Sequence, residues 1–206
     1  GRSPWDPGWR DLGCWAEACL EVAPPVACWI GWSLGGTLSL QAALMAPQRL
    51  RGLGLVTATP KFLRSDDWPQ AMPEPTLRGF AGELLADPQL TMERFLALQV
   101  RGSEAGRETL RRLRQSLRAR PRARAEALMT GLEILARTDL RTLLARLRLP
   151  SDWLFGDRDT LVPAGIAAQV SGLGNGIHTR VLTGAGHAPW LSHPTATLEW
   201  LRAFAL

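Results

Sequence analysis

A serine between two glycines, directly after a short apolar run, constrains the fold of this chain more than any other feature. The apolar run covers residues 26–30, Ser33 lies in the pattern G-x-S-x-G between Gly31 and Gly35, and apolar residues with helical spacing follow over 38–45. This order predicts a strand, a sharp turn that carries the serine, and a helix. Glycines suit such a turn because we expect a Cβ at either flanking position to collide with the neighbouring strand or helix.

The length and composition of the chain are sufficient for one buried hydrophobic core. Its 206 residues are enough for one domain with an insertion, and the fractions of hydrophobic residues, 46%, and charged residues, 21%, are ordinary for soluble globular proteins. No apolar run approaches the roughly 20 residues that cross a bilayer. The net charge of +5 comes almost entirely from arginine, since Lys61 is the only lysine. We therefore expect a soluble chain that does not bind membranes, and we expect a monomer.

The cysteines and histidines show neither a disulfide framework nor a metal site. The 3 cysteines are odd in number and lack C-x-x-C spacing, and the 3 histidines lack the H-E-x-x-H spacing of a zinc-binding helix. We expect reduced thiols, a cytoplasmic location, and a site without metal or cofactor. The residues concerned are Cys14, Cys19, Cys28, His178, His187 and His193.

Short β-like runs alternate with longer helical segments along the chain. Alternation of this kind predicts an α/β fold, with a mostly parallel sheet covered by helices on both faces. We assign residues 1–58 and 151–206 to this core. The expected strands cover residues 26–32, 50–58, 151–156 and 179–183, and the expected core helices cover 34–46 and 198–204.

A long stretch between the second and third strands, residues 59–150, has helical patterns and no strand signal. In an open α/β sheet, an insertion after the carboxyl end of a strand lies over the crevice where ligands bind, so we expect a helical lid that shapes the substrate pocket. The expected helices of the insertion cover residues 77–85, 92–100, 104–117, 123–136 and 140–147.

Arginines crowd the middle of this insertion. One interpretation is a solvated helix face, and the other is a surface for an acidic partner. Nucleic acid is a less favoured partner because no aromatic residues interleave the arginines to stack on bases. The arginines are Arg107, Arg111, Arg112, Arg114, Arg118, Arg120, Arg122 and Arg124.

Ser33 has two candidate partners for nucleophilic catalysis downstream. A serine hydroxyl needs a base within hydrogen-bond reach and a carboxylate that orients the base. Asp159 follows the third expected strand and His187 follows the fourth. The order serine, aspartate, histidine is the order of α/β hydrolases. Asp157 competes for the carboxylate role, but it lies closer to the strand, where we expect it to cap the turn.

Each of these residues also has an ordinary structural interpretation. Ser33 could cap a helix, Asp159 could stabilise a turn, and His187 could be a loop histidine that bonds to backbone groups. Three such residues in the right order, each in a loop after a strand, favour the catalytic interpretation. His178 begins an expected strand and His193 precedes a proline, so we expect neither to be the base.

Several longer strings resemble one particular family of α/β hydrolases, the pimeloyl-[acyl-carrier protein] methyl ester esterases of biotin synthesis. The pattern G-x-S-x-G is shared by many hydrolases, whereas ERFLALQ and GLEIL are more specific to this family. The resemblance extends over nearly the whole chain. The strings are GWSLGG over 31–36, ERFLALQ over 93–99, GLEIL over 131–135, DLR over 139–141 and HAP over 187–189.

The resemblance implies a serine carboxylesterase that hydrolyses the methyl ester of pimeloyl carried on acyl carrier protein. It implies the catalytic triad Ser33, Asp159 and His187, with the Leu34 N–H facing the oxyanion. Substrate-contacting positions by resemblance are Trp32, Ser33, Leu34, Phe95, Leu96, Ala97, Leu98, Gln99 and His187. Carrier-binding positions are Arg94, Arg107 and Arg111, while Leu90 stands where the family has a further arginine.

The start of the chain departs from the family pattern. Gly1, Arg2 and Ser3 resemble the end of the G-x-G-x-S loop that follows the fourth strand of the fold. We therefore expect the N-terminal strands of the sheet, and the H-G loop with the second oxyanion donor, to be missing from this chain. If the chain is complete, we expect poor folding and little activity.

Two alternatives remain open at this point. The same triad could act on another small ester, a lactone or a carbon–carbon substrate, because lids diverge readily between related hydrolases. A truncated α/β module could instead bind a ligand or partner without catalysis.

Overall fold

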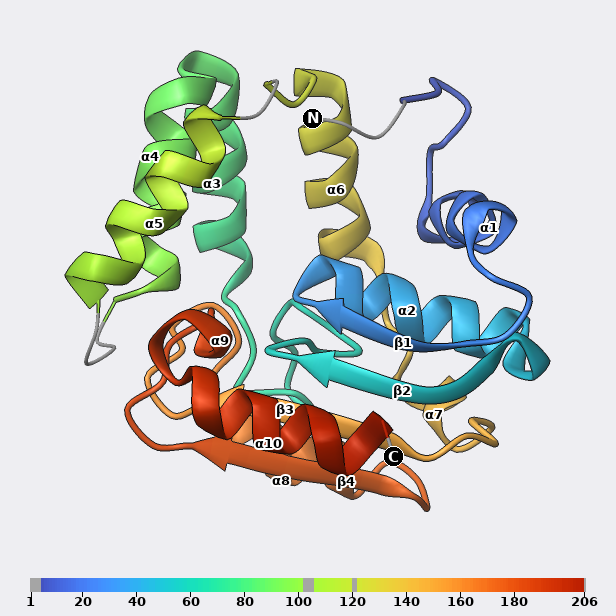
Figure 1. Ribbon diagram of the computed structural model, residues 1–206. Coiled ribbons are helices and arrows are strands. Elements are labelled where there is room, and N and C mark those ends of the chain that lie inside the picture. The colour runs from blue at the N-terminus through green and yellow to red at the C-terminus, as the bar shows by residue number, and fades with distance from the viewer. Residues whose placement is uncertain (1–4, 102–105, 120–121, 206) are drawn as a thin grey trace.

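A four-stranded parallel sheet forms the centre of the computed structural model, which describes residues 5–101, 106–119 and 122–205 (Figure 1). The spatial order of the strands is the same as their order in the sequence, and every neighbouring pair is parallel. The strands are β1 (Ala27–Trp32), β2 (Leu50–Val56), β3 (Ser151–Gly156) and β4 (Ile177–Leu182). All the expected strands are confirmed, with ends shifted by one or two residues at most. The second strand ends earlier than expected because Thr57 turns the chain with a φ of 44°.

Helices cover both faces of the sheet, as expected for an α/β fold. One face packs against α1 (Leu12–Val22), α2 (Leu34–Met45) and α8 (Gly165–Ser171), and the other packs against α10 (Pro194–Ala205). The first face forms the larger core. Residues that contribute to it include Leu40 from α2, Leu53 and Leu55 from β2, Trp153 and Phe155 from β3, and Ile166 and Val170 from α8.

Two of these helices were not predicted from the sequence. In α1 the buried residues Leu12, Ala16 and Leu20 recur every four positions, and the side chain of Asp11 caps the helix by accepting from the Cys14 N–H. That spacing with an aspartate cap is an ordinary helix signal. The other unpredicted helix, α8, has only 7 residues, and it packs its buried side chains against β4.

Glycines in β2 let α10 approach the sheet closely. A Cβ at Gly52 would lie 2.9 Å from the Phe204 ring, and one at Gly54 would lie 3.0 Å from the Trp200 ring. The rings of Trp200 and Phe204 stack on each other at 6.0 Å. The last helix thus packs two large aromatic rings over a strand that has no side chains at these positions. It begins at Pro194, earlier than the predicted residue 198.

The segment between β2 and β3 is helical, as predicted. Its helices are α3 (Glu74–Ala86), α4 (Pro88–Gln99), α5 (Gly106–Arg118), α6 (Ala125–Arg137) and α7 (Arg141–Leu144). Figure 1 shows α3, α4 and α5 grouped together and α6 standing nearer to α2. The last of the predicted helices is shorter than expected because Arg146 and Leu147 bond three residues back, to Leu143 and Leu144, in tight turns.

Some predictions concern residues outside the described ranges. The predicted helix over 104–117 begins within residues 102–105, and the resemblance at Gly1, Arg2 and Ser3 lies within residues 1–4. In the described chain, β1 is an edge strand of the sheet. Across the described ranges, we find no helix with the length and apolar character needed to cross a membrane.

Ion pairs connect the beginning of the inserted segment to its end. Arg141 donates to both carboxylate oxygens of Asp139 at 2.9 and 2.8 Å and to Asp67 at 2.9 Å, and Lys61 lies 3.3 Å from Asp139. The Arg141 guanidinium also lies over the Trp68 ring at 5.2 Å. Hydrogen bonds from Arg141 lower the pKa of Asp139 to about 2, while Asp139 raises the pKa of Arg141. The DLR string thus joins the two ends of the insertion.

Candidate active site

Ser33 lies at a strained turn between β1 and α2. Its φ of 53° falls in the left-handed region, and only one other non-glycine residue of the described chain, Thr57, has a positive φ. The Ser33 N–H donates to the Val56 carbonyl at 3.0 Å, which ties the turn to the end of β2. The Ser33 side chain makes no capping bond to α2. The helix-cap interpretation of this serine is therefore wrong, and its half-buried hydroxyl is left for another role.

Close packing explains one glycine of the G-x-S-x-G pattern but not the other. A Cβ at Gly31 would lie 2.4 Å from the Gly35 carbonyl oxygen, so only glycine fits there. A Cβ at Gly35 would meet nothing within 4 Å, and the expected collision at this position is wrong. The second tight position is Gly36, where a Cβ would lie 2.4 Å from the Ala58 Cβ. The turn from β1 into α2 is thus packed tightly at Gly31 and Gly36, whereas Gly35 is exposed to solvent.

Asp159 and His187 form a buried pair. The His187 Nδ1 lies 2.7 Å from the Asp159 Oδ2, and the residues are only 1% and 5% exposed, respectively. The other carboxylate oxygen accepts from the N–H groups of Leu161 and Val162 at 2.8 and 3.0 Å. Because an ionised carboxylate only accepts hydrogen bonds, the histidine donates from Nδ1, and in a neutral imidazole the Nε2 is then the acceptor. The arrangement fixes both the tautomer and the orientation of the ring.

The backbone of His187 is held from three directions. Its carbonyl accepts from the Trp32 Nε1 at 2.8 Å and from the Thr57 Oγ1 at 2.9 Å, and its N–H donates to the Gln99 carbonyl at 2.9 Å. The Trp32 ring lies 5.6 Å from the imidazole between centroids. The residue before Ser33 therefore contacts the histidine directly. Thr57 was not predicted, and its only signal in the sequence is a polar residue at the carboxyl end of an apolar strand.

The His187 Nε2 is the reactive atom of this pair. It is buried and has no hydrogen-bond partner within the described ranges. A buried imidazole nitrogen without a proton or a partner can accept a proton from a hydroxyl that approaches it. The turn of Ser33, next to Trp32, supplies a hydroxyl in this part of the molecule.

The competing candidates have other contacts. The Asp157 Oδ1 accepts from the Gly184 N–H at 2.7 Å, which links the loops after β3 and β4, in agreement with the predicted capping role. His178 lies in β4, and the His193 ring bonds to the neighbouring Ser192 hydroxyl at 2.8 Å. Within the described ranges, no hydrogen bond or ion pair joins Asp157 or these histidines to the Asp159–His187 pair.

Leu34 is the first residue of α2, so its N–H has no partner within the helix and adds to the positive end of the helix dipole. Its side chain packs toward α6 and α1. A Cβ at Gly131, in the GLEIL string, would lie 3.2 Å from the Leu34 Cδ2 and 3.6 Å from the Trp15 ring. The string thus allows α6 to approach the start of α2.

The ERFLALQ string forms the end of α4 and reaches the histidine through its last residue. Gln99 is buried, and its side-chain oxygen has no hydrogen-bond partner within the described chain. Leu96 is buried, whereas Ala97 and Leu98 are half-buried. The Phe95 ring, one turn before Gln99, packs against Phe80 of α3 at 5.4 Å. The string therefore connects the candidate site to the helices of the insertion.

The arginines singled out by resemblance lie on the exposed side of the insertion. Arg94 pairs with Glu83 at 3.2 Å, and Arg111 pairs with Glu108 at 2.8 Å. Arg107 is exposed and has no ion-pair partner in the described part of the chain. No cluster of histidine, cysteine and carboxylate side chains that could hold a metal ion occurs within the described ranges.

Comparisons with known proteins agree with this architecture. A family model described as the alpha/beta hydrolase fold matches residues 12–194. A pimeloyl-[acyl-carrier protein] methyl ester esterase of Xanthomonas oryzae pv. oryzae is 44% identical over 185 residues, which are 90% of this chain and 73% of the relative. An esterase of the same name from Klebsiella pneumoniae subsp. pneumoniae is 44% identical over 196 residues, 95% of this chain and 76% of that protein.

Solved structures show the same fold at lower identity. An esterase from Exiguobacterium antarcticum superposes with a TM-score of 0.86 at 20% identity, covering 98% of this chain and 76% of that one. A bromoperoxidase from Bacillus anthracis gives a TM-score of 0.82 at 18% identity, covering 98% and 78%. The predicted fold class is confirmed by these comparisons and by the parallel sheet.

Proposed function

Since this chain belongs to the family of pimeloyl-[acyl-carrier protein] methyl ester esterases, within the α/β hydrolases, we propose that it hydrolyses the methyl ester of pimeloyl-acyl carrier protein in biotin synthesis. The observation that carries the mechanism is the buried Asp159–His187 pair, with its bond of 2.7 Å and an Nε2 that has no partner in the described chain. The imidazole lies against Trp32, the residue before the strained turn of Ser33. No metal or cofactor takes part in the proposed reaction.

The first half of the reaction forms an acyl-enzyme. The Ser33 Oγ attacks the carbonyl carbon of the methyl ester while its proton passes to the His187 Nε2. Asp159 stabilises the imidazolium that forms. The N–H of Leu34, at the positive end of α2, donates to the oxyanion. Collapse of the tetrahedral intermediate breaks the bond to the methoxy oxygen, which takes the proton from His187 and leaves as methanol.

The second half returns the enzyme to its starting state. A water molecule attacks the acyl carbon and gives its proton to the His187 Nε2. The bond between the acyl carbon and the Ser33 Oγ then breaks, and the serine recovers its proton from the histidine. The product is the free carboxylate of the carrier-bound pimeloyl chain. The balance is one ester and one water consumed for one acid and one methanol.

We assign the helical segment 59–150 the role of a lid over the acyl chain. The supporting contact is the bond between the Gln99 carbonyl and the His187 N–H, because it joins the end of α4 to the catalytic loop. Half-buried Phe95 and Leu98 on α4 supply apolar surface suited to methylene groups. Trp32, the residue before the serine, supplies further apolar surface beside His187.

The acyl carrier protein is the proposed partner, bound through Arg94, Arg107 and Arg111. Carrier proteins of this type are acidic, and electrostatic attraction by exposed guanidiniums raises the association rate. The proposed reaction needs neither nucleic acid nor a membrane nor a second copy of the chain. We expect the enzyme to act as a monomer in the cytoplasm.

The substrate is tested by comparing kcat/KM for pimeloyl-carrier methyl ester with kcat/KM for short p-nitrophenyl esters. A strong preference for the carrier-bound ester is expected, with methanol and the free acid as products. Equal values for both substrates would contradict the assignment and favour a hydrolase of another small ester or lactone. The absence of turnover with both, together with ligand binding, would favour a non-catalytic module.

A further inference from the structure

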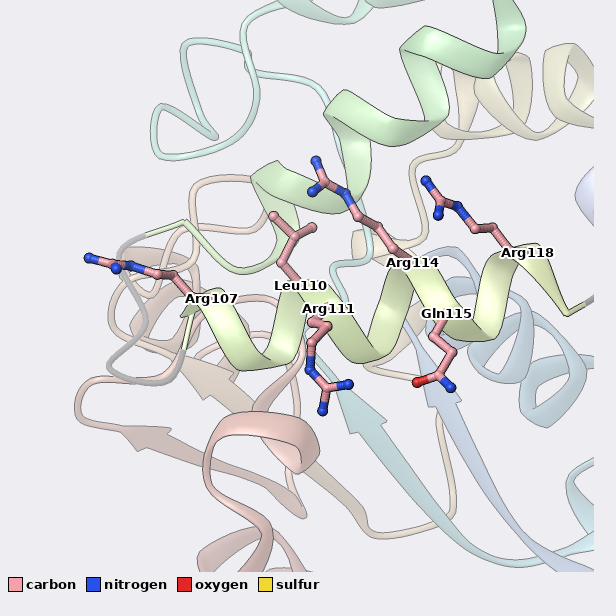
Figure 2. Close-up of a pocket in the computed structure, with 6 residues that line it drawn as sticks. All are labelled: Arg107, Leu110, Arg111, Arg114, Gln115 and Arg118. Carbon is pink, nitrogen blue, oxygen red and sulfur yellow. The ribbon is translucent and has the colours of Figure 1, made fainter.

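Helix α5 has an arginine-lined face over a hollow of about 580 Å³. Figure 2 shows the six residues that line it, all from this helix. Two rows of side chains are visible, and within each row the residues are four positions apart in the sequence. Leu110, Arg114 and Arg118 point to one side of the helix axis in this view, and Arg111 and Gln115 point to the other, in the row that Arg107 begins. Rows spaced by four residues are the ridges between which a second helix packs.

The opposite side of α5 is the side that attaches it to the protein. Thr109 is the buried residue of this helix, and α5 packs against α4 and against α9 (Pro189–Ser192), which follows His187. Arg107, Arg111, Arg114 and Arg118 are all exposed. Apart from Arg118, which lies 4.0 Å from Glu93 of α4, these arginines form no ion pair with another described helix, so the lined face is available to a partner.

The arginines of this face differ in their internal partners. Glu108 accepts from Arg111 at 2.9 and 2.8 Å and from Arg112 at 2.9 Å, and these bonds lower its pKa to about 2. Arg118 lies 4.0 Å from Glu93. Arg114, like Arg107, has no ion-pair partner within the described ranges. Glu108 thus already binds Arg111, whereas Arg114 is available to bind a carboxylate of another molecule.

We propose that Leu110, Arg114 and Arg118 form a second wall of the carrier-docking surface, opposite Arg107 and Arg111, and that an acidic helix of the carrier protein lies between the two rows. The proposal rests on the proposed function, which supplies an acidic carrier protein as the partner. It adds Leu110, Arg114 and Arg118 to the positions implied by family resemblance.

The dimensions of the face fit a helix. From Arg107 to Arg118 the helix rises about 16 Å, or roughly three turns, at 1.5 Å per residue. Carboxylates spaced one turn apart on a partner helix would meet guanidiniums along this length, and Leu110 offers an apolar contact within the charged surface. A single phosphate would need only one or two of these arginines. Nucleic acid is disfavoured because no aromatic side chain lines the face.

The proposal also assigns a role to Glu108. Its carboxylate holds Arg111 in the free enzyme, and a carboxylate of the carrier has to replace it when the partner helix binds. Glu108 is thus an internal competitor that weakens docking, and removal of its charge strengthens docking. Exposed ion pairs are weak, so this effect is small.

The first test measures the ratio of kcat/KM on pimeloyl-carrier methyl ester to kcat/KM on a short p-nitrophenyl ester. In the double variant Arg114→Glu/Arg118→Glu we expect the ratio to fall by about 10- to 100-fold at low salt, through KM, and the difference to shrink in high salt. The matched control is Arg202→Glu together with Arg148→Glu, two exposed arginines outside α5 that give the same charge change. We expect the control to change the ratio by less than about twofold.

The second test uses Glu108→Gln, for which we expect the same ratio to rise by about two- to fivefold at low salt. A wild-type enzyme without preference for the carrier-bound ester would overturn the proposed function itself. A wild-type preference that survives Arg114→Glu/Arg118→Glu as well as it survives the control would overturn only the second wall. An equal loss of kcat/KM on both substrates would show that the substitutions disturb the fold of α5, and it would also contradict docking there.

Discussion

Two carboxylates of this protein each hold a basic side chain, and their surroundings give the two pairs different functions. Asp159 is buried and bonds to His187 at 2.7 Å, with its second oxygen fixed by two backbone N–H groups. Glu108 is on the surface and bonds to Arg111 and Arg112. Water and salt can replace the partners of the surface pair but do not reach the buried pair. The buried pair is suited to proton transfer and the surface pair to recognition.

The difference between the two pairs predicts that substitution of a buried residue has a larger effect on activity or stability than substitution of an exposed one. The largest effect is expected for Asp159→Asn, because an amide can donate to the His187 Nδ1 and thereby favour the wrong tautomer. We expect kcat to fall by about 10³- to 10⁴-fold, as for the aspartate of other serine triads. Steady-state kinetics on a short ester measures it. Unchanged kcat in a folded variant would contradict the role of Asp159, and Asp157→Asn serves as the matched control.

Glycine substitutions at the serine turn test the packing that holds the buried site. Gly31→Ala places a Cβ 2.4 Å from a backbone oxygen, so we expect the free energy of unfolding to fall by several kcal/mol or the protein not to fold. Gly35→Ala meets nothing within 4 Å, and we expect a change within about 0.5 kcal/mol. Thermal unfolding of the two variants measures this difference. Equal stabilities would contradict the packing described for Gly31.

Thr57 tests how the histidine loop is held. Thr57→Val removes the hydroxyl that donates to the His187 carbonyl at 2.9 Å, and Thr57→Ser retains it. We expect Thr57→Val to lower stability by about 1–2 kcal/mol and to lower kcat more than it raises KM. Thr57→Ser should recover most of the loss in kcat. Equal kcat for the two variants would show that the hydroxyl does not position His187.

Asp139 lies between the two extremes, since 37% of its side chain is exposed. Its pKa of about 2 in the folded protein is below the value of about 3.9 in an unfolded chain. A lowered pKa contributes stability above about pH 4, and this stability is lost as the pH falls toward 2. With solvent screening, we expect Asp139→Asn to cost about 1 kcal/mol at pH 7. Denaturant unfolding of both proteins at several pH values measures it, and a constant difference down to pH 2 would contradict the ion pair.

The sequence predicts the parts of the site that have their own chemistry. Ser33, Asp159 and His187 stand after strands in a distinctive order, and apolar runs mark each strand clearly. The contacts that orient these residues come from segments far apart in the chain. Thr57 bonds to a residue 130 positions away, and the Trp32 side chain bonds across 155 positions. No local pattern contains such a contact.

The same limit explains the incorrect expectation at Gly35. Both glycines of the pattern permit a sharp turn, but the collision at Gly36 depends on where Ala58 lies after β2. Likewise, the DLR string was predicted only as a mark of family membership. Its physical role appears when Asp139 and Arg141 meet Lys61 and Asp67 from the start of the insertion.

We propose that Ser33 is a nucleophile activated by His187. The most direct measurement is mass spectrometry of the protein after reaction with a fluorophosphonate, with the modified peptide identified by fragmentation. We predict one adduct per chain on Ser33, none in Ser33→Ala, and a strongly slowed reaction in His187→Ala. An adduct on another residue, or undiminished labelling in Ser33→Ala, would contradict the claim.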